Sequence, residues 1–383
     1  MRIVFIIAKR CALNRPFRFI KAAIIGCGKI AEAHAEVIKN FASIATLVAT
    51  CDKELLMARQ LAERFDAKSF YDDLPKMLKE QHPDVVHITT PPQSHYELAK
   101  TCLEAGCHVF VEKPFTVNAA ESRDLVDLAI SKNLKLTIGT DEQFSPVALE
   151  MRQLIKSGWL GGLPTHMDVY YCYDLGDERY ARAFLKNRSH WLWRLPGQLI
   201  QNIIPHAVMK FCEFMADDEV TVSARGFTSK LLQNLGELEL KDELRAIVTD
   251  SNQTTAYLTF STQIGPLLRQ FLIFGPKNSL LLDQDHQALI KIPGKTYKSY
   301  LEKTIPLNNF ARQYRQNMFR NIKLFLKREF QMKQGLYNLL RLFYQSIVNN
   351  TPPPISYNQI IMSSRIIDEI ISQIYGQKAD HNY

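Results

Sequence analysis

The sequence predicts a two-domain protein: an α/β domain with a doubly wound parallel sheet, then an α+β domain with an open, mainly antiparallel sheet. Three observations support this prediction. The chain has 383 residues, which is long for a single domain. Short apolar runs alternate with amphipathic stretches over residues 19–140, as in parallel sheets covered by helices. After residue 145, runs rich in β-branched and aromatic residues follow one another across short turns, which indicates antiparallel strands.

The first domain is assigned to residues 19–144, after an N-terminal extension of residues 1–18. Its strands are short apolar runs, and its helices carry Leu, Ala, Glu and Lys at helical spacing. Crossovers of this length place helices on both faces of a parallel sheet. In chain order we expect strand 19–25, helix 29–39, strand 44–50, helix 53–64, strand 84–88, helix 94–105, strand 108–111, helix 118–132 and strand 135–138.

The second domain is assigned to residues 145–383. Turns such as 250–252 separate its strands, a loop is expected at 179–194, and the prolines at 352–354 break the chain before a last helix. We expect helices at 148–156, 198–215 and 357–374, one or two long helices within 307–347, and strands near 164–173, 219–227, 244–250, 253–261, 267–275 and 278–292.

The composition is that of a globular protein, with 46% hydrophobic and 22% charged residues. It excludes a disordered, collagen-like or disulfide-scaffold protein, and no apolar stretch is long enough to predict a membrane-spanning helix. The seven cysteines are scattered and include no Cys-x-x-Cys pair. This pattern favours reduced thiols in a cytoplasmic protein over disulfides, and no metal site is expected.

The net charge of +8 belongs to one segment. Residues 295–341 contain eleven Lys or Arg and two Asp or Glu, a balance of +9, so the rest of the chain sums to −1. Within 308–341 aromatic and aliphatic residues recur every three or four positions between the basic ones, which predicts an amphipathic helix with a basic face. Such a helix can lie on an anionic membrane, dock a protein partner, or pack on the second domain with its charges in water. Nucleic-acid binding is not predicted, because no motif accompanies the charge.

A glycine-rich turn, Gly26-Cys-Gly28-Lys29-Ile30-Ala31, joins the first predicted strand to the first helix. The first glycine permits a tight turn, the second lets a diphosphate approach the backbone, and the small Ala31 lets helix and strand pack closely. The N-terminus of the helix then offers free N–H groups to the phosphates. This arrangement predicts a dinucleotide site.

Asp52 ends the second predicted strand, 24 residues after Gly28. A carboxylate at this place can accept hydrogen bonds from both ribose hydroxyls and repels a 2′-phosphate, which favours NAD over NADP. Lys53 beside it could instead hold that phosphate, so NADP stays possible. Asp52 could also simply cap the following helix.

Two further motifs follow predicted strands: Thr89-Thr90-Pro91-Pro92-Gln-Ser-His95 and Glu112-Lys113-Pro114. Both lie at carboxyl ends of parallel strands, where open α/β sheets bind ligands. A lysine held there by a proline can supply fixed positive charge to a developing alkoxide. Taken alone, a Glu-Lys-Pro sequence is usually a surface turn.

Together, Gly26-x-Gly28-x-x-Ala31, Asp52, the Thr-x-Pro-Pro-x-x-His segment and Glu112-Lys113-Pro114 resemble the motifs of the Gfo/Idh/MocA oxidoreductases. The resemblance covers about residues 20–290 and returns at 335–374. It implies a Rossmann domain, NAD(P)-linked hydride transfer at a carbinol of a sugar, inositol or nucleotide sugar, and a second domain whose open sheet often forms homo-oligomers. The residues implied to bind the cofactor are Gly26, Gly28, Lys29, Ile30, Asp52, Thr90, Pro91, His95, Glu112 and Lys113.

The resemblance also implies a second catalytic element, which corresponds to Pro196–His206 in this chain. Asn202 and His206 are four residues apart, so on a helix they share one face. His206 would take the hydroxyl proton, and Lys113 would orient the hydroxyl. Three positions depart from the commoner pattern: Asn202 cannot titrate, Gln198 replaces a glycine, and Met209 stands where an acidic residue often follows. They put the substrate and the catalytic competence in doubt.

Aromatic and basic residues downstream are candidates for substrate binding, because aromatic faces suit sugar rings and arginine suits diphosphates. They are Tyr171, Tyr173, His190, Trp191 and Trp193, and the basic Arg179, Arg182, Lys186 and Arg188. The alternative for each is sheet packing or a solvated loop.

The function we expect is an NAD-dependent sugar or nucleotide-sugar dehydrogenase, in the setting of polysaccharide synthesis. Two alternatives stay open. One is an NAD-dependent glycoside hydrolase that oxidises its substrate transiently, and the other is a non-catalytic NAD-binding scaffold.

Overall fold

The computed structural model describes residues 19–175, 178–216, 219–295, 297–327 and 333–376. The predicted extension 1–18 lies outside these residues, as does Cys11. The six described cysteines are buried and free. No described helix is long and apolar enough to cross a membrane.

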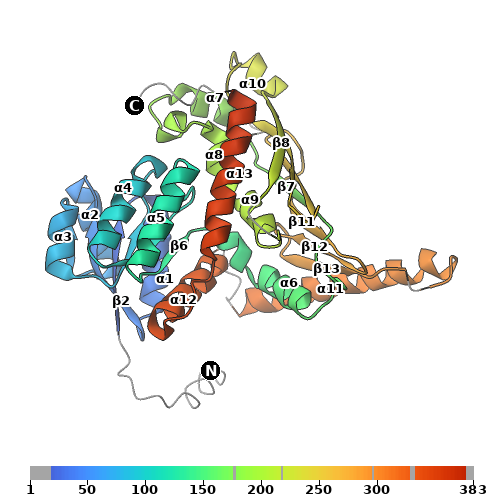
Figure 1. Cartoon of the computed structure of the whole chain (residues 1–383), viewed down its shortest axis with the longest axis horizontal. Helices are drawn as coiled ribbons and strands as arrows, with labels where there is room; N and C mark the ends of the chain where they lie inside the picture. The colour runs from blue at the N-terminus through green and yellow to red at the C-terminus, as the bar shows by residue number, and fades with distance from the viewer. Residues whose placement is uncertain (1–18, 176–177, 217–218, 296, 328–332, 377–383) are drawn as a thin grey trace.

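The first domain contains a six-stranded parallel sheet in the order β3-β2-β1-β4-β5-β6, with helices on both faces (Figure 1). This confirms the predicted doubly wound α/β class. Its strands are β1 (Ile20–Ile25), β2 (Ala45–Cys51), β3 (Ser69–Tyr71), β4 (Val85–Ile88), β5 (His108–Val111) and β6 (Leu136–Ile138). Its helices are α1 (Lys29–Asn40), α2 (Leu55–Phe65), α3 (Leu74–Gln81), α4 (His95–Glu104) and α5 (Ala119–Ser131). The prediction omitted β3 and α3.

The second domain contains a seven-stranded sheet in the order β13-β12-β11-β7-β10-β9-β8. All its strand pairs are antiparallel except β7 with β10, which confirms the predicted open, mainly antiparallel sheet. The strands are β7 (His166–Cys172), β8 (Thr221–Phe227), β9 (Glu243–Thr249), β10 (Thr255–Ser261), β11 (Arg269–Phe274), β12 (Ser279–Asp283) and β13 (Ala288–Ile292). The run expected as one strand at 278–292 is therefore a hairpin of β12 and β13.

Eight α-helices accompany the second sheet among the described residues: α6 (Pro146–Lys156), α7 (Glu178–Lys186), α8 (Gln198–Ile203), α9 (Pro205–Cys212), α10 (Lys230–Asn234), α11 (Ile305–Leu326), α12 (Gln334–Asn349) and α13 (Tyr357–Tyr375). Two expectations were wrong here. The loop predicted at 179–194 contains α7, and the single helix predicted at 198–215 is divided into α8 and α9 at Pro205, which has no N–H to continue the ladder.

The two C-terminal helices connect the domains. Apolar side chains of α12, including Leu339 and Phe343, belong to the core of the first domain. Helix α13 contributes Ile360 to that core and Ile370 to the core of the second domain. Figure 1 shows α12 and α13 running between the two sheets.

Candidate active site

The turn between β1 and α1 fits a dinucleotide. Gly26 has a φ of +87°, and a Cβ there would lie 2.5 Å from Thr90 Cγ2 and 2.8 Å from Thr90 N, so only glycine is tolerated. A Cβ on Gly28 would meet nothing within 4 Å. The open space therefore lies directly in front of the N-terminus of α1, where a diphosphate would accept from its free N–H groups. Lys29 and Ile30 are exposed on this first turn, and Ala31 is buried against the sheet.

Asp52 lies beside this turn. Its Oδ2 accepts a hydrogen bond from the backbone N of Cys27 at 2.6 Å, and its Oδ1 accepts one from the backbone N of Glu54 at 3.0 Å. Each carboxylate oxygen keeps acceptor capacity for a ribose hydroxyl. The side chain thus both shapes the glycine turn and borders the space in front of it.

The turn after β4 is joined to the turn after β5 by His95. His95 is fully buried, with Nε2 2.8 Å from the carbonyl O of Thr90 and Nδ1 2.8 Å from the carbonyl O of Pro114. Burial lowers its pKa, although these carbonyls oppose the effect. Thr90 is partly exposed and Pro91 is exposed, so these two residues can contact a ligand. His95 is buried beneath them and holds their turn in place.

Glu112 accepts from a buried chain of hydrogen bonds. Glu112 Oε1 lies 3.0 Å from His34 Nε2, and His34 Nδ1 lies 3.0 Å from His87 Nδ1. His87 Nε2 lies 2.8 Å from the hydroxyl O of Tyr344 on α12. One direction of donation along this chain satisfies every atom: the Tyr344 hydroxyl donates to His87, His87 donates to His34, and His34 donates to the carboxylate of Glu112. Although burial opposes it, this bond and the charge of Lys113 lower the pKa of Glu112.

Lys113 reaches across to the second domain. Its Nζ donates to the carbonyl O of Asn202 at 3.0 Å and to Asn202 Oδ1 at 3.3 Å. Burial lowers the pKa of Lys113, while Glu112, Asp141 and Glu142 counteract the effect. The structure therefore brings together two of the three residues predicted to be catalytic.

His206, the third, stands on the first turn of α9. Burial lowers its pKa to about 4, an effect that Glu142 opposes and that Lys113 and Lys210 reinforce. The imidazole is therefore neutral at neutral pH and able to accept a proton. Its Nδ1 is buried without a hydrogen-bond partner among the described residues, and its ring lies parallel to that of Tyr171 at 6.0 Å between centroids.

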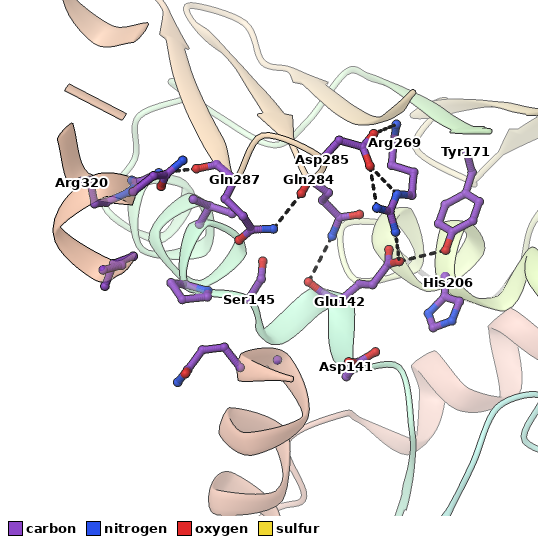
Figure 2. Close-up of a pocket in the computed structure, with 16 residues that line it drawn as sticks. Asp141, Glu142, Ser145, Tyr171, His206, Arg269, Gln284, Asp285, Gln287 and Arg320 are labelled. Carbon is purple, nitrogen blue, oxygen red and sulfur yellow. Dashed lines mark hydrogen bonds and ion pairs between the residues drawn. The ribbon is translucent and has the colours of Figure 1, made fainter. Parts of the chain in front are cut away.

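A cavity of about 520 Å³ opens beside His206 between the second sheet and helices α6, α11 and α12 (Figure 2). Glu142 is the centre of its polar lining: Glu142 Oε1 accepts from the Tyr171 hydroxyl at 2.9 Å, and Oε2 lies 2.9 Å from Lys210 Nζ. Arg269 Nη1 lies 3.7 Å from Glu142 Oε1, and Arg269 Nη2 lies 2.6 Å from Asp285 Oδ1. The cavity thus presents hydroxyl, carboxylate, amide and guanidinium groups to a polar ligand.

The two neighbouring acids of this cavity differ in charge. Burial alone would raise the pKa of Glu142, but Lys210 and His206 hold it at about 2. Burial, together with the negative charges of Glu112 and Glu142, raises the pKa of Asp141 to about 7. Glu142 is therefore ionised at neutral pH, while Asp141 titrates near it.

The sequence motifs did not predict four residues of this site: Asp141, Glu142, Lys210 and Arg269. A signal existed for the two acids, because they follow β6 as Thr90 follows β4 and Glu112 follows β5. Lys210 offered another, since a lysine within the apolar helix α9 needs a buried partner. Arg269 lies on a strand whose pattern gave no such hint.

Of the residues predicted as substrate candidates, Tyr171 lines this cavity, and the others are not part of its described lining. The described lining of the cavity includes none of Tyr173, Arg188, His190 and Trp191. Arg188 pairs with Glu237 and stacks on Trp193, with 4.0 Å from its Cζ to the ring centroid. The backbone O of Trp191 accepts from Gln93 Nε2 at 2.9 Å, which ties this segment to the turn after β4.

The positions that depart from the family pattern are accommodated without disrupting the fold. Gln198 keeps the left-handed backbone that glycine favours, with a φ of +44°, and its Oε1 is buried without a partner among the described residues. Met209 is fully buried in the core, and its carbonyl O accepts from Gln143.

Comparisons with known proteins agree with this geometry. The family model GFO_IDH_MocA, described as an oxidoreductase family with an NAD-binding Rossmann fold, matches residues 20–140. D-glucoside 3-dehydrogenase of Escherichia coli (strain K12) is 35% identical over 143 residues, which are 37% of this chain and 40% of that protein. The aligned part of the chain thus spans less than half the length of that curated relative.

Two solved structures cover nearly the whole chain. UDP-N-acetylglucosamine 3-dehydrogenase GnnA from Acidithiobacillus ferrooxidans aligns with a TM-score of 0.69 at 18% identity, over 94% of this chain and 98% of that one. The WlbA dehydrogenase from Bordetella pertussis, solved with NADH and UDP-GlcNAcA, aligns with a TM-score of 0.73 at 16% identity. The alignment covers 93% of this chain and 95% of that one. At these identities the likeness establishes that both domains share the fold of these dehydrogenases.

Proposed function

We propose, from the premise that the chain belongs to the Gfo/Idh/MocA family of NAD-binding oxidoreductases, that it transfers a hydride between NAD and a carbinol carbon of a sugar or nucleotide sugar. The observation that carries this proposal is the meeting of Lys113, at the carboxyl end of β5, with Asn202 of α8, close to the neutral His206. These groups come from both domains, and His206 also lines the polar cavity.

Each of the three residues has a separate role. Lys113 donates to the substrate hydroxyl oxygen and stabilises the negative charge that develops there. Asn202 holds the ammonium group through two acceptor atoms. His206 would accept the hydroxyl proton. NAD held at the glycine turn and Asp52 would supply the hydride acceptor, so that the carbinol would become a carbonyl. An imidazole with a pKa of about 4 is unprotonated, and thus ready to act as a base, across the neutral range.

The cofactor is proposed to be NAD rather than NADP. Asp52 borders the glycine turn and keeps acceptor capacity on both oxygens, which suits two ribose hydroxyls. A 2′-phosphate would meet this carboxylate at close range.

The substrate class follows from the cavity and from the names of the relatives. A cavity of about 520 Å³ is of the size that holds small molecules, and its lining of Glu142, Tyr171, Arg269 and Gln284 can bind several hydroxyls at once. D-glucoside 3-dehydrogenase and UDP-N-acetylglucosamine 3-dehydrogenase are relatives by sequence or structure, and both names describe oxidation of a sugar.

The test is replacement of Lys113 by Ala. We expect this variant to lose turnover by at least about 100-fold, the scale of one electrostatic stabiliser, while binding of NADH stays nearly unchanged. NADH formation would be followed by absorbance against a panel of glycosides and UDP-sugars, and NADH binding by titration. The matched control is Lys100→Ala, which removes a partly exposed lysine of α4 in the same domain.

Full activity of Lys113→Ala would remove Lys113 from the reaction. Release of a free sugar without net NADH from the parent chain would instead favour hydrolysis by transient oxidation. Absence of turnover with every substrate would favour the scaffold alternative.

A further inference from the structure

The amphipathic helix α11 packs with its polar side against the protein. Gln313 and Asn317 pair with the backbone N–H and C=O groups of Lys291 and Leu289, at 2.7 to 3.2 Å. These groups belong to β13, an edge strand of the second sheet. The side-chain amides thus complete the hydrogen bonds that an edge strand leaves open. One turn further on, Arg320 binds Glu150 at 3.0 Å.

The apolar side of α11 is turned outward. An exposed stripe recurs at intervals of three, four and seven residues, and Phe319, Phe325 and Leu326 are 63%, 72% and 75% exposed. We call this set the outer stripe; it consists of Leu307, Tyr314, Met318, Phe319, Ile322, Phe325 and Leu326. A helix that serves only to cover a sheet shows the opposite arrangement, with its apolar side inward. The outer stripe therefore contributes nothing to either core.

Basic residues accompany the outer stripe: on the helix surface Arg312 and Lys323 lie along one side of it, and Arg315 lies between Ile322 and Leu326. Arg312, Arg315 and Lys323 are exposed and have no acidic partner among the described residues. The 22 residues of α11 contain no Asp or Glu. Directly before the helix, Tyr297 and Tyr300 are exposed as well, and such aromatic residues favour the interface between lipid and water.

We propose that α11 docks the protein on an anionic membrane surface, lying in the plane of the interface with the outer stripe among the lipid headgroups. The combination of an exposed apolar stripe with unpaired basic residues matches helices that bind in this way. Two copies of this chain meeting through the stripe would bring Arg312, Arg315 and Lys323 close to their counterparts, so like charges oppose self-association. In Figure 1 α11 lies at the edge of the molecule and extends beyond the sheet, so a flat surface can reach it.

The docking surface and the cavity share one helix. Arg320, Asn321 and Leu324 line the cavity from the inner side of α11. Docking through the outer stripe would therefore hold the cavity roughly one helix diameter, about 10 Å, from the headgroups.

The test uses the full chain and two kinds of vesicle: phosphatidylcholine alone, and phosphatidylcholine mixed with phosphatidylglycerol. We expect the protein to sediment with the mixed vesicles only, and less so as salt rises. The double variant Arg315→Gln/Lys323→Gln should lower the partition coefficient roughly fivefold for each charge removed. The double variant Phe319→Ser/Phe325→Ser should lose binding by a larger factor, since each removes a large apolar side chain from the interface.

The matched control is Lys230→Gln/Leu238→Ser, which removes an exposed lysine and an exposed leucine near α10 and should bind vesicles like the parent. Thermal unfolding and NADH titration verify that each variant is folded. Failure of the parent chain to bind mixed vesicles overturns the proposal. Light scattering gives a second test. Concentration-dependent dimerisation of the parent chain that Phe319→Ser/Phe325→Ser abolishes would also overturn the proposal, because the outer stripe would then be an interface between copies.

Discussion

Gln198 occupies a backbone position that suits glycine. Its φ of +44° costs a residue with a side chain about 1 kcal/mol, and its buried Oε1 has no hydrogen-bond partner among the described residues. We expect Gln198→Gly to remove both the backbone strain and the unpaired oxygen. Glycine loses more backbone entropy on folding, and after this cost is subtracted the free energy of unfolding should rise by about 1 kcal/mol. Chemical denaturation measures the difference.

A second substitution at this residue separates the two causes. Gln198→Ala removes the unpaired Oε1 but keeps a Cβ at positive φ, so it should gain less than Gln198→Gly. A stability of Gln198→Gly at or below that of the parent would mean that the packing of the glutamine side chain outweighs the strain.

At the scale of elements, α12 is tied through Tyr344 to the end of strand β5, which precedes Lys113. The Tyr344 hydroxyl donates to His87, which leads through His34 to Glu112, the residue before Lys113. Tyr344→Phe leaves His87 Nε2 buried and without a donor. We expect a loss of about 1 to 3 kcal/mol in the free energy of unfolding, the cost of an unsatisfied buried group, measured by denaturation.

Tyr337→Phe is the matched control, because this partly buried tyrosine of α12 makes no hydrogen bond to a described residue through its hydroxyl. It should leave stability within about 0.5 kcal/mol of the parent. Equal stability of Tyr344→Phe and Tyr337→Phe would show that the chain of hydrogen bonds contributes nothing to folding.

The elements that the sequence predicted well are those with a clear hydrophobic signal. The strands β1, β2, β4, β5 and β6 begin and end within one residue of their predicted ranges. Short elements were not predicted: β3 has three residues and α3 has eight. Helix α3 did carry local signals, because Asp73 caps it through its side chain and Pro75 lies in its first turn. Helix α7 was not predicted, because its pattern of Arg and Glu was interpreted as a charged loop.

The site divides in the same way. Local motifs predicted the glycine turn, Asp52 and Lys113, since each depends on residues near one another in sequence. The cavity depends on contacts between distant segments: Glu142 meets Tyr171 of β7, Lys210 of α9 and Arg269 of β11. No spacing along the chain encodes such a meeting, and for that reason the sequence predicted Tyr171 but not Glu142, Lys210 or Arg269 around it.

At the scale of the whole molecule, the two domains share their cores through α12 and α13, so we expect them to unfold as one unit. All three tryptophans, Trp159, Trp191 and Trp193, lie in the second domain, so tryptophan fluorescence reports on that domain alone. ADP-ribose carries the part of NAD that would bind at Gly26, Gly28 and Asp52 in the first domain. At about 100 times its dissociation constant it should stabilise the protein by about 2.7 kcal/mol and raise the fluorescence transition by about 3 °C.

Circular dichroism should show the same shift, because the two probes then follow one transition. The control is Gly28→Val. An added Cβ there meets nothing within 4 Å, so this variant should fold, but its side chain would occupy the space before α1 and abolish the response to ADP-ribose. If ADP-ribose moved the circular dichroism transition and left the fluorescence transition in place, the domains would unfold independently. In that case the apolar contacts of α12 with the first domain, and those of α13 with both, would be too weak to couple them.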